Sequence, residues 1–283
     1  MSLFLGGLLM IAILLSLVLW CLGAQAETIE NTKRAIVVGA SVGMGAQISK
    51  LLAADGYIVG MAARRISLLE KLQEEIPTET YIVQMDASNP DDAVEKLNNL
   101  VEEMGGLDLL VIAITGFFEC DFASKDWKDS RAVLNVDVTG FFALARTGLQ
   151  IFEQQGYGHL VGFSSIDGLH GVAFCPAYSA SKAFCSRYLE AERNKYIQRN
   201  MPIFITDIVP GWIDSKKDFD YNAVPNAYWV ETLEDATQEI FEAIKNKTQV
   251  AYICKRWQKV AELLKIIPND LYNALSARPG GSF

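Results

Sequence analysis

The chain has few of the residues that metal centres, disulfide frameworks and nucleic-acid surfaces require. Its 283 residues include only two histidines, His159 and His170, so a histidine-based metal site or a Ser–His–Asp triad has little support. The five cysteines form no C-x-x-C pair, which indicates neither a zinc site nor a disulfide framework. A net charge of −9 argues against nucleic acid as the main partner. What is present, 51% hydrophobic residues, suffices for one sizeable core but not for two full domains.

The N-terminus carries an apolar run over residues 3–22, long enough to span the hydrocarbon core of a membrane. The Ala-Gln-Ala sequence at 24–26 resembles a signal-peptidase site, so cleavage and export stay open as an alternative. No basic residue precedes the run, however, and the first positive charges, Lys33 and Arg34, follow it. Under the positive-inside rule this favours a single-pass anchor with the rest of the chain facing the cytoplasm.

Beyond the apolar run, predicted strands and helices alternate, which indicates the α/β class with a doubly wound parallel sheet, the Rossmann fold. The first strand, over 35–39, runs into a glycine-rich turn and then a helical segment over 46–54. Such a turn offers backbone N–H groups to a pyrophosphate, although a tight turn without a ligand uses glycine as well. The candidate cofactor contacts in the turn are Gly39, Ser41, Gly43, Met44 and Gly45.

The next two strands also end at candidate cofactor residues. The strand over 57–61 is followed by Arg64 and Arg65, with no acidic residue to bind a ribose 2′-hydroxyl. Two arginines suit a 2′-phosphate, so NADP is favoured over NAD; the alternative is a solvated pair that opens the helix over 66–75. The strand over 81–85 ends at Asp86, a predicted contact to the adenine edge.

The candidate catalytic pair is Tyr178 and Lys182, which follow Pro176 at the start of a predicted helix. Residues four apart share a helix face, so the phenol and the ammonium point into one cleft. A fixed cation nearby favours the phenolate, and a phenol tuned in this way passes a proton to or from a reacting oxygen.

From about residue 35 to residue 248 the chain resembles the short-chain dehydrogenase/reductase family. The resemblance rests on motifs in family order: Gly39, Gly43, Gly45, Asp86, Ser165, Tyr178, Lys182, Pro210 and Gly211. It implies that Tyr178 is the general acid/base, that Lys182 lowers its pKa and binds the nicotinamide ribose, and that Ser165 hydrogen-bonds the substrate oxygen. It also implies that Ile213 and Ser215 hold the nicotinamide carboxamide and phosphates.

The chain departs from the family pattern at two places. The family's Asn-Asn-Ala-Gly after strand four is replaced here by residues 113–116, Ala-Ile-Thr-Gly. The family's catalytic Asn aligns with Asp137, and Asn135, two residues away, lies on another helix face. The charge of Asp137 would stabilise protonated Lys182 and oppose phenolate formation at Tyr178. A non-catalytic nucleotide-binding sensor or scaffold is therefore the alternative function.

These features predict a membrane-anchored NADP(H)-dependent oxidoreductase that interconverts a carbonyl and an alcohol. The aromatic residues between 212 and 230 favour an apolar or lipid-like small-molecule substrate. The basic, amphipathic helix expected before Pro268 packs on the core, on a second subunit or on a membrane surface. We expect a homodimer or homotetramer. The predicted division is 1–26, anchor or signal peptide; 27–34, linker; 35–253, a single nucleotide-binding domain; 254–283, amphipathic tail.

Overall fold

The computed structural model describes residues 32–116, 126–173, 175–214 and 229–276. The predicted anchor over residues 3–22 and the predicted cofactor residue Ser215 lie outside these ranges. No helix among the described residues is long and apolar enough to cross a membrane. The chain divides into two compact units, Met1–Lys33 and Arg34–Phe283, and the fold given below is that of the second unit.

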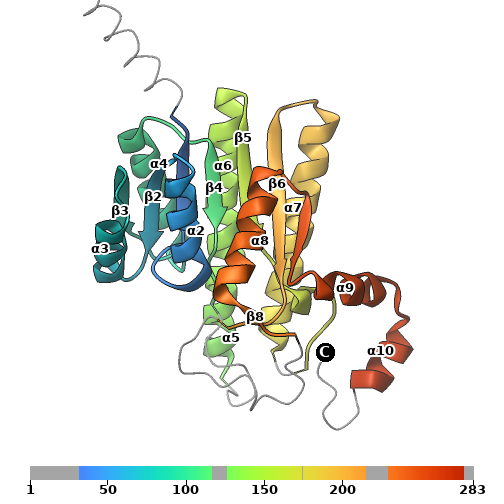
Figure 1. Cartoon of the computed structure of the whole chain (residues 1–283). Coiled ribbons are helices and arrows are strands. Elements are labelled where there is room, and N and C mark those ends of the chain that lie inside the picture. The colour runs from blue at the N-terminus through green and yellow to red at the C-terminus, as the bar shows by residue number, and fades with distance from the viewer. Residues whose placement is uncertain (1–31, 117–125, 174, 215–228, 277–283) are drawn as a thin grey trace, which may run out of the picture. The chain divides into compact units, whose positions relative to one another are not determined.

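The second unit is built on a seven-stranded sheet with the order β3-β2-β1-β4-β5-β6-β9, in which every neighbouring pair is parallel (Figure 1). The order of the strands along the chain reverses between β1 and β4. Because all seven strands are parallel, their carboxyl ends lie along one edge of the sheet on both sides of this point. The predicted doubly wound parallel sheet is thereby confirmed. The strands are β1 Arg34–Val38, β2 Ile58–Ala63, β3 Thr80–Gln84, β4 Leu109–Ile112, β5 Gly158–Phe163, β6 Ile203–Pro210 and β9 Val250–Ile253; β7 Ile213–Asp214 pairs with β8 Glu231–Thr232 in a separate small sheet.

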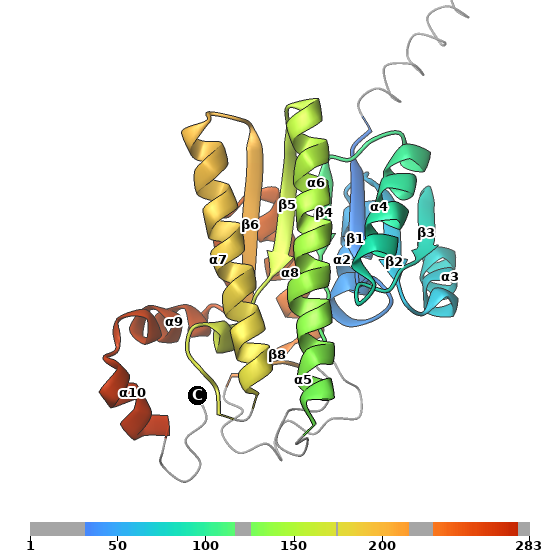
Figure 2. The ribbon, with the colours of Figure 1, turned by 180° about the vertical axis from the view of Figure 1, so that it is seen from behind.

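Helices cover both faces of the large sheet, because successive side chains of a strand point to opposite faces. In β1, Ala35 and Val37 pack with α2, α3 and α8, whereas Ile36 and Val38 pack with α4, α6 and α7 on the other face (Figures 1 and 2). All four side chains are at most 2% exposed, which explains why the strand reads as a continuous apolar run. These helices are α2 Gly43–Ala54, α3 Ile66–Glu75, α4 Pro90–Met104, α6 Phe141–Gln155, α7 Pro176–Gln198 and α8 Leu233–Lys245.

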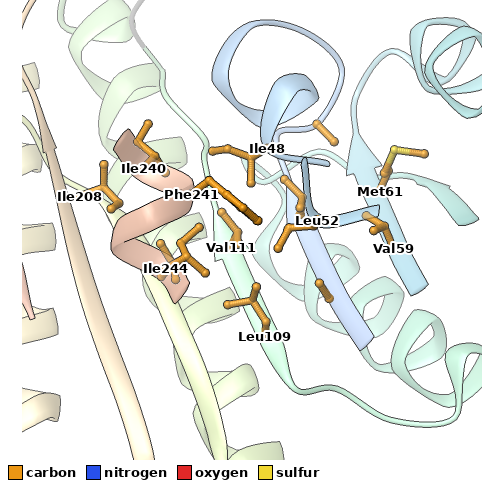
Figure 3. Packing of buried hydrophobic residues seen from close by; sticks show 14 of the residues in the cluster. Ile48, Leu52, Val59, Met61, Leu109, Val111, Ile208, Ile240, Phe241 and Ile244 are labelled. Carbon is orange, nitrogen blue, oxygen red and sulfur yellow. The ribbon is translucent and has the colours of Figure 1, made fainter. Parts of the chain in front are cut away.

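The core under α2 and α8 supports the glycine-rich turn. Ile48 and Leu52 of α2 meet Phe241 of α8 above Val111 of β4 (Figure 3). Ile48, Leu52 and Val111 are fully buried, and burial of an aliphatic side chain contributes about 1.5–3 kcal/mol. This packing fixes the start of α2 above the centre of the sheet.

The structure differs from the sequence-based expectation in two helical regions. The helix expected around residues 131–154 is divided into α5 Trp127–Leu134, a π-helical turn η1 Asn135–Gly140, and α6. The tail continues past the predicted helix, now α9 Arg256–Ile266, into a further helix, α10 Asn269–Ser276. The π turn coincides with close packing, since a Cβ on Gly140 would lie 2.1 Å from the carbonyl oxygen of Ala87.

Candidate active site

Three candidate catalytic residues converge at the carboxyl edge of the sheet. Ser165 follows the end of β5 and is 7% exposed. Tyr178 and Lys182 lie on the first turns of α7, whose first residue is Pro176, as suits a proline without a backbone N–H. The Lys182 Nζ lies 5.5 Å from the centre of the Tyr178 ring. The fold thus brings together two hydroxyls and one ammonium.

The hydroxyls of Ser165 and Tyr178 are hydrogen-bonded to each other. Burial raises the pKa of Tyr178 above its ordinary value, and the carboxylates of Asp167 and Asp137 add to the rise. Lys182 and the bond from Ser165 act in the opposite direction but do not cancel the effect of burial on this pKa. Tyr178 is therefore a protonated phenol at neutral pH in this state.

Lys182 is 2% exposed and surrounded by acceptors. Its Nζ donates to the carbonyl oxygens of Phe163 at 3.3 Å and Ile114 at 3.4 Å, and lies 3.5 Å from Oδ2 of Asp137. Burial alone would lower the pKa of Lys182, but Asp137 and then Tyr178 more than offset it, and the net pKa is raised. Lys182 therefore carries its positive charge within the site.

Asp137 is fully buried in the π turn η1, and its carboxylate joins three segments. Oδ1 accepts the backbone N–H of Gly116 at 2.6 Å, and Oδ2 accepts the Ser181 hydroxyl at 3.3 Å. The Asp137 backbone oxygen accepts the Cys185 thiol at 3.2 Å. Asp137 thus supports the segment after β4, where the family's asparagines are missing, and also faces Lys182.

Ser164, the neighbour of Ser165, turns away from this cluster. Its hydroxyl donates to Oδ1 of Asp207 on β6 at 2.6 Å, and both residues are at most 3% exposed. Ser164 therefore ties β5 to β6.

The glycine-rich turn has the geometry of a phosphate cradle. Gly39 and Gly43 have φ values of +92° and +62°, which glycine adopts without strain, and Gly45 lies against Gly39, where a Cβ would be 2.3 Å from the Gly39 carbonyl oxygen. Helix α2 begins at Gly43 with no side-chain cap and no acidic residue in its first turn. Its first N–H groups thus offer an anion a partly positive helix end. Met44 lies in this first turn and packs against the core. These residues fit the pyrophosphate of a dinucleotide.

Beside the cradle lie the two predicted arginines, both exposed, at the end of β2. The Arg65 guanidinium donates to Oγ of Ser41 at 3.0 Å, so it crosses the glycine-rich turn, while the Arg64 backbone oxygen accepts Gln84 Nε2 at 3.0 Å. Asp86 follows β3, where its Oδ1 accepts the N–H of Ser88 at 2.9 Å. The Asp86 side chain is thereby oriented by its own turn.

The predicted segment after β6 is described only in part. Pro210 is the last residue of β6, and Gly211 lies under the indole of Trp257, where a Cβ would be 2.2 Å from Cδ1. Ile213 is buried in β7. The sequence therefore places a glycine where an indole covers the backbone.

The sequence analysis did not single out Asp167, two residues after Ser165. The backbone N–H of Asp167 donates to Oγ of Ser165 at 3.2 Å, and burial raises the pKa of its carboxyl to about 6. The position of Asp167 in the sequence, two residues after a candidate catalytic serine, could have identified it as a site residue. The side chain lines a narrow pocket with Ile166, His170, Val172, Trp257, Leu264 and Tyr272. Within the described residues no group of His, Cys, Asp and Glu side chains is arranged to hold a metal ion.

Comparison with known proteins identifies the family to which this site belongs. A sequence profile described as short chain dehydrogenase matches residues 33–223. The chain belongs to the short-chain dehydrogenase/reductase family. It is accordingly an oxidoreductase that acts on CH–OH groups of a small molecule with a nicotinamide nucleotide.

Relatives and solved structures agree with this assignment. An uncharacterized oxidoreductase of Myxococcus xanthus is 32% identical over 253 residues, which cover 87% of this chain and 97% of the relative. An uncharacterized oxidoreductase of Mycobacterium tuberculosis is 31% identical over 192 residues, covering 65% of this chain and 74% of the relative. The fold is similar to that of acetoin dehydrogenase from Enterobacter cloacae, with a TM-score of 0.69 and 20% identity. The match covers 78% of this chain and 94% of that structure. It is also similar to that of a 7β-hydroxysteroid dehydrogenase, with a TM-score of 0.69 and 23% identity. This match covers 83% of this chain and 92% of that structure.

Proposed function

We propose that the enzyme interconverts a carbonyl and an alcohol on an apolar or lipid-like small molecule with NADP(H), using Tyr178 as general acid/base. The observation that carries this proposal is the contact of half-buried Tyr178 with buried Ser165 and Lys182 at the carboxyl edge of the sheet, beside the glycine-rich turn. Ligands of doubly wound sheets bind outside this edge.

The choice of NADP is supported by the charges around the turn. Arg65 reaches across to Ser41, Arg64 is exposed beside it, and no carboxylate follows β2 to bind a ribose 2′-hydroxyl. Guanidinium groups bind phosphate through charge-assisted, often bidentate hydrogen bonds. In this proposal Gly39, Gly43 and the start of α2 hold the pyrophosphate, Asp86 the adenine edge, and Ile213 the nicotinamide side.

The proposed mechanism uses each hydroxyl at one oxygen atom of the substrate. In reduction, Tyr178 donates its phenolic proton to the carbonyl oxygen, and Ser165 donates a hydrogen bond to the same oxygen as negative charge develops there. In oxidation, the Tyr178 phenolate takes the proton of the alcohol. A bound nicotinamide nucleotide supplies or accepts the hydride. Lys182 stabilises the phenolate by its charge.

Asp137 opposes formation of the Tyr178 phenolate, which the oxidation direction of this mechanism requires. Its carboxylate pairs with Lys182, and its charge raises the pKa of Tyr178. We therefore propose that Asp137 is a positioning residue that favours the protonated phenol, and with it the reduction of carbonyls over the oxidation of alcohols at neutral pH.

An apolar substrate is supported by the wall of the narrow pocket near Ser165. Ile166, Val172 and Leu264 are buried or nearly so and line it together with the indole of Trp257. The aromatic segment that the sequence assigned to the substrate lies mostly outside the described residues, at 215–228.

We also propose that the enzyme forms a homodimer or homotetramer. Phe142 on α6 is 44% exposed, and its ring contacts those of Phe184 and Tyr188 on α7 at 6.4 and 5.2 Å. Two adjacent helices therefore present a partly exposed aromatic cluster, a type of residue that is enriched at interfaces.

Tyr178→Phe should lower turnover at least about a hundredfold, because only the proton-transfer oxygen is removed. NADPH affinity, measured by fluorescence titration, should remain nearly unchanged. The matched control is Tyr188→Phe on the same helix, where the buried hydroxyl has no hydrogen-bond partner among the described residues. Turnover of the Tyr178 variant within a few-fold of the parent would exclude the assignment.

Arg65→Ala should weaken NADPH binding about tenfold to a hundredfold and leave NADH binding nearly unchanged, because a charge-assisted contact to the 2′-phosphate contributes about 1.5–3 kcal/mol. Arg64→Ala should act in the same direction. Arg187→Ala, on an arginine 80% exposed on α7, is the control for a general loss of charge. Equal weakening of both cofactors in the Arg65 variant would contradict the choice of NADP.

Asp137→Asn should raise the rate of alcohol oxidation about threefold to tenfold near neutral pH, the factor that roughly 1 kcal/mol of electrostatic interaction gives. Loss of the negative charge lowers the pKa of Tyr178, so the phenolate forms at lower pH and the pH profile of alcohol oxidation should shift to lower pH. The amide oxygen still accepts the Gly116 N–H, whereas Asp137→Ala leaves this N–H without an acceptor and should be less stable than Asp137→Asn by about 1–3 kcal/mol in thermal unfolding. An unchanged pH profile in a folded Asn variant would refute the effect.

We propose finally that residues 1–26 anchor the enzyme in a membrane, with the catalytic domain facing the cytoplasm. The apolar run at 3–22 and the charges of Lys33 and Arg34 support this orientation. The full chain should resist carbonate extraction, and deletion of residues 1–26 should release an active enzyme, since the sheet begins at Arg34. Recovery outside the cytoplasm of a mature chain beginning at Glu27 would show instead that the segment is a cleaved signal peptide.

A further inference from the structure

The two C-terminal helices expose three large aliphatic side chains. Leu263 and Ile266 on α9 are 57% and 78% exposed, and Leu271 on α10 is 51% exposed. Single exposed aliphatic residues are common, but three within nine positions of one helix pair form a surface that excludes water when it is covered. We call it the α9–α10 ridge.

The ridge lies on the side of α9 that faces away from the core. Trp257, Ala261 and Leu264 form the buried side of the helix. Lys259 and Leu263 are four residues apart, and Ile266 lies one turn beyond Leu263, so basic and apolar side chains share the outer face. The exposed side of α9 therefore carries both charged and apolar side chains: Arg256 and Lys259 lie in its N-terminal half, and Leu263 and Ile266 lie in its C-terminal half together with Glu262 and Lys265.

The charge of this segment is opposite in sign to that of the whole chain. Residues 255–276 contain four basic and two acidic residues, a net charge of +2, whereas the chain as a whole carries −9. The basic residues are Lys255, Arg256, Lys259 and Lys265, and the acidic ones are Glu262 and Asp270. A positive apolar surface on an acidic protein is complementary to a negatively charged surface with an apolar interior.

We propose that the α9–α10 ridge docks on an anionic lipid bilayer, with Leu263, Ile266 and Leu271 in the interface and Arg256 and Lys259 at the lipid phosphates. A second copy of the chain fits this surface less well. A two-fold contact would set the basic residues of one copy against either the basic or the apolar residues of the other, and neither of these supplies the negative charge that the basic residues would pair with. A bilayer of anionic lipids provides both the negative charge and the apolar depth.

The inner side of the same helices contacts the loop that follows Ser165. The His170 ring donates from Nε2 to the carbonyl oxygen of Leu264 at 2.6 Å and stacks on Tyr272 at 4.1 Å. The Tyr272 hydroxyl donates to the carbonyl oxygen of Gly171 at 3.1 Å. The helices that carry the ridge therefore also wall the pocket near Ser165.

This arrangement gives the docked enzyme a pocket that is one helix away from lipid. Leu264 lines the pocket, while its neighbour Leu263 belongs to the ridge. An apolar substrate dissolved in the bilayer then has a short path to the catalytic residues. This last consequence rests on the proposed function; the docking itself does not.

Photo-crosslinking of the full chain tests the docking. A benzophenone amino acid replaces Ile266 or, as a matched control, Ile197, which is 59% exposed on α7. The protein is reconstituted in vesicles of phosphatidylcholine with phosphatidylglycerol, irradiated, and analysed by mass spectrometry. Lipid adducts are expected at position 266 in several-fold excess over position 197. Lys259→Gln should lower the yield at position 266 about fivefold in these vesicles, and much less in phosphatidylcholine alone.

Three results would overturn the proposal. Chain-to-chain adducts at position 266 in place of lipid adducts would show that a second copy covers the ridge. Equal lipid yields at positions 266 and 197, or no adducts at either, would show that the ridge does not lie on lipid. Carbonyl reduction measured on the same samples keeps the two proposals apart, because loss of turnover with lipid adducts intact would count against the proposed function alone.

Discussion

The buried carboxylate of Asp137 is the contact on which the arrangement of the active site depends. It accepts the Gly116 N–H, faces the Lys182 ammonium and accepts the Ser181 hydroxyl, so it connects the end of β4, the π turn and α7. Removal of one partner of a buried ion pair typically costs about 3–5 kcal/mol, because an uncompensated charge remains. Asp137 thus connects the first turns of α7, which carry Tyr178, to the segment after β4.

The same carboxylate contributes to the charge balance around the Tyr178 hydroxyl. Two carboxylates, Asp137 and Asp167, act on Tyr178 in one direction, while Lys182 and the hydrogen bond from Ser165 act in the other. Burial reinforces the carboxylates and raises the pKa of Tyr178 above its ordinary value. A site with this balance keeps Tyr178 protonated at neutral pH. The family's usual asparagine would leave the ammonium unopposed at this position.

The C-terminal helices extend the site beyond the nucleotide-binding sheet. His170 and Tyr272 join α9 and α10 to the loop after Ser165 by a hydrogen bond, a ring stack and a second hydrogen bond. Trp257 covers Gly211 at the end of β6, where any larger residue would collide with the indole. One face of this helix pair thus shapes the pocket while the other exposes aliphatic and basic side chains.

Local patterns in the sequence determined the elements of the fold and predicted most of the candidate site residues. The helix expected over 66–75 has those bounds, and the apolar runs became buried parallel strands, because hydrophobic periodicity and glycine positions act over a few residues. Tertiary structure alone decided the π turn at Asn135–Gly140, the bond between Gly116 and Asp137, and the environment of Asp167. Each of these depends on contacts between segments that are distant along the chain or on the burial that such contacts produce, and no local pattern records them.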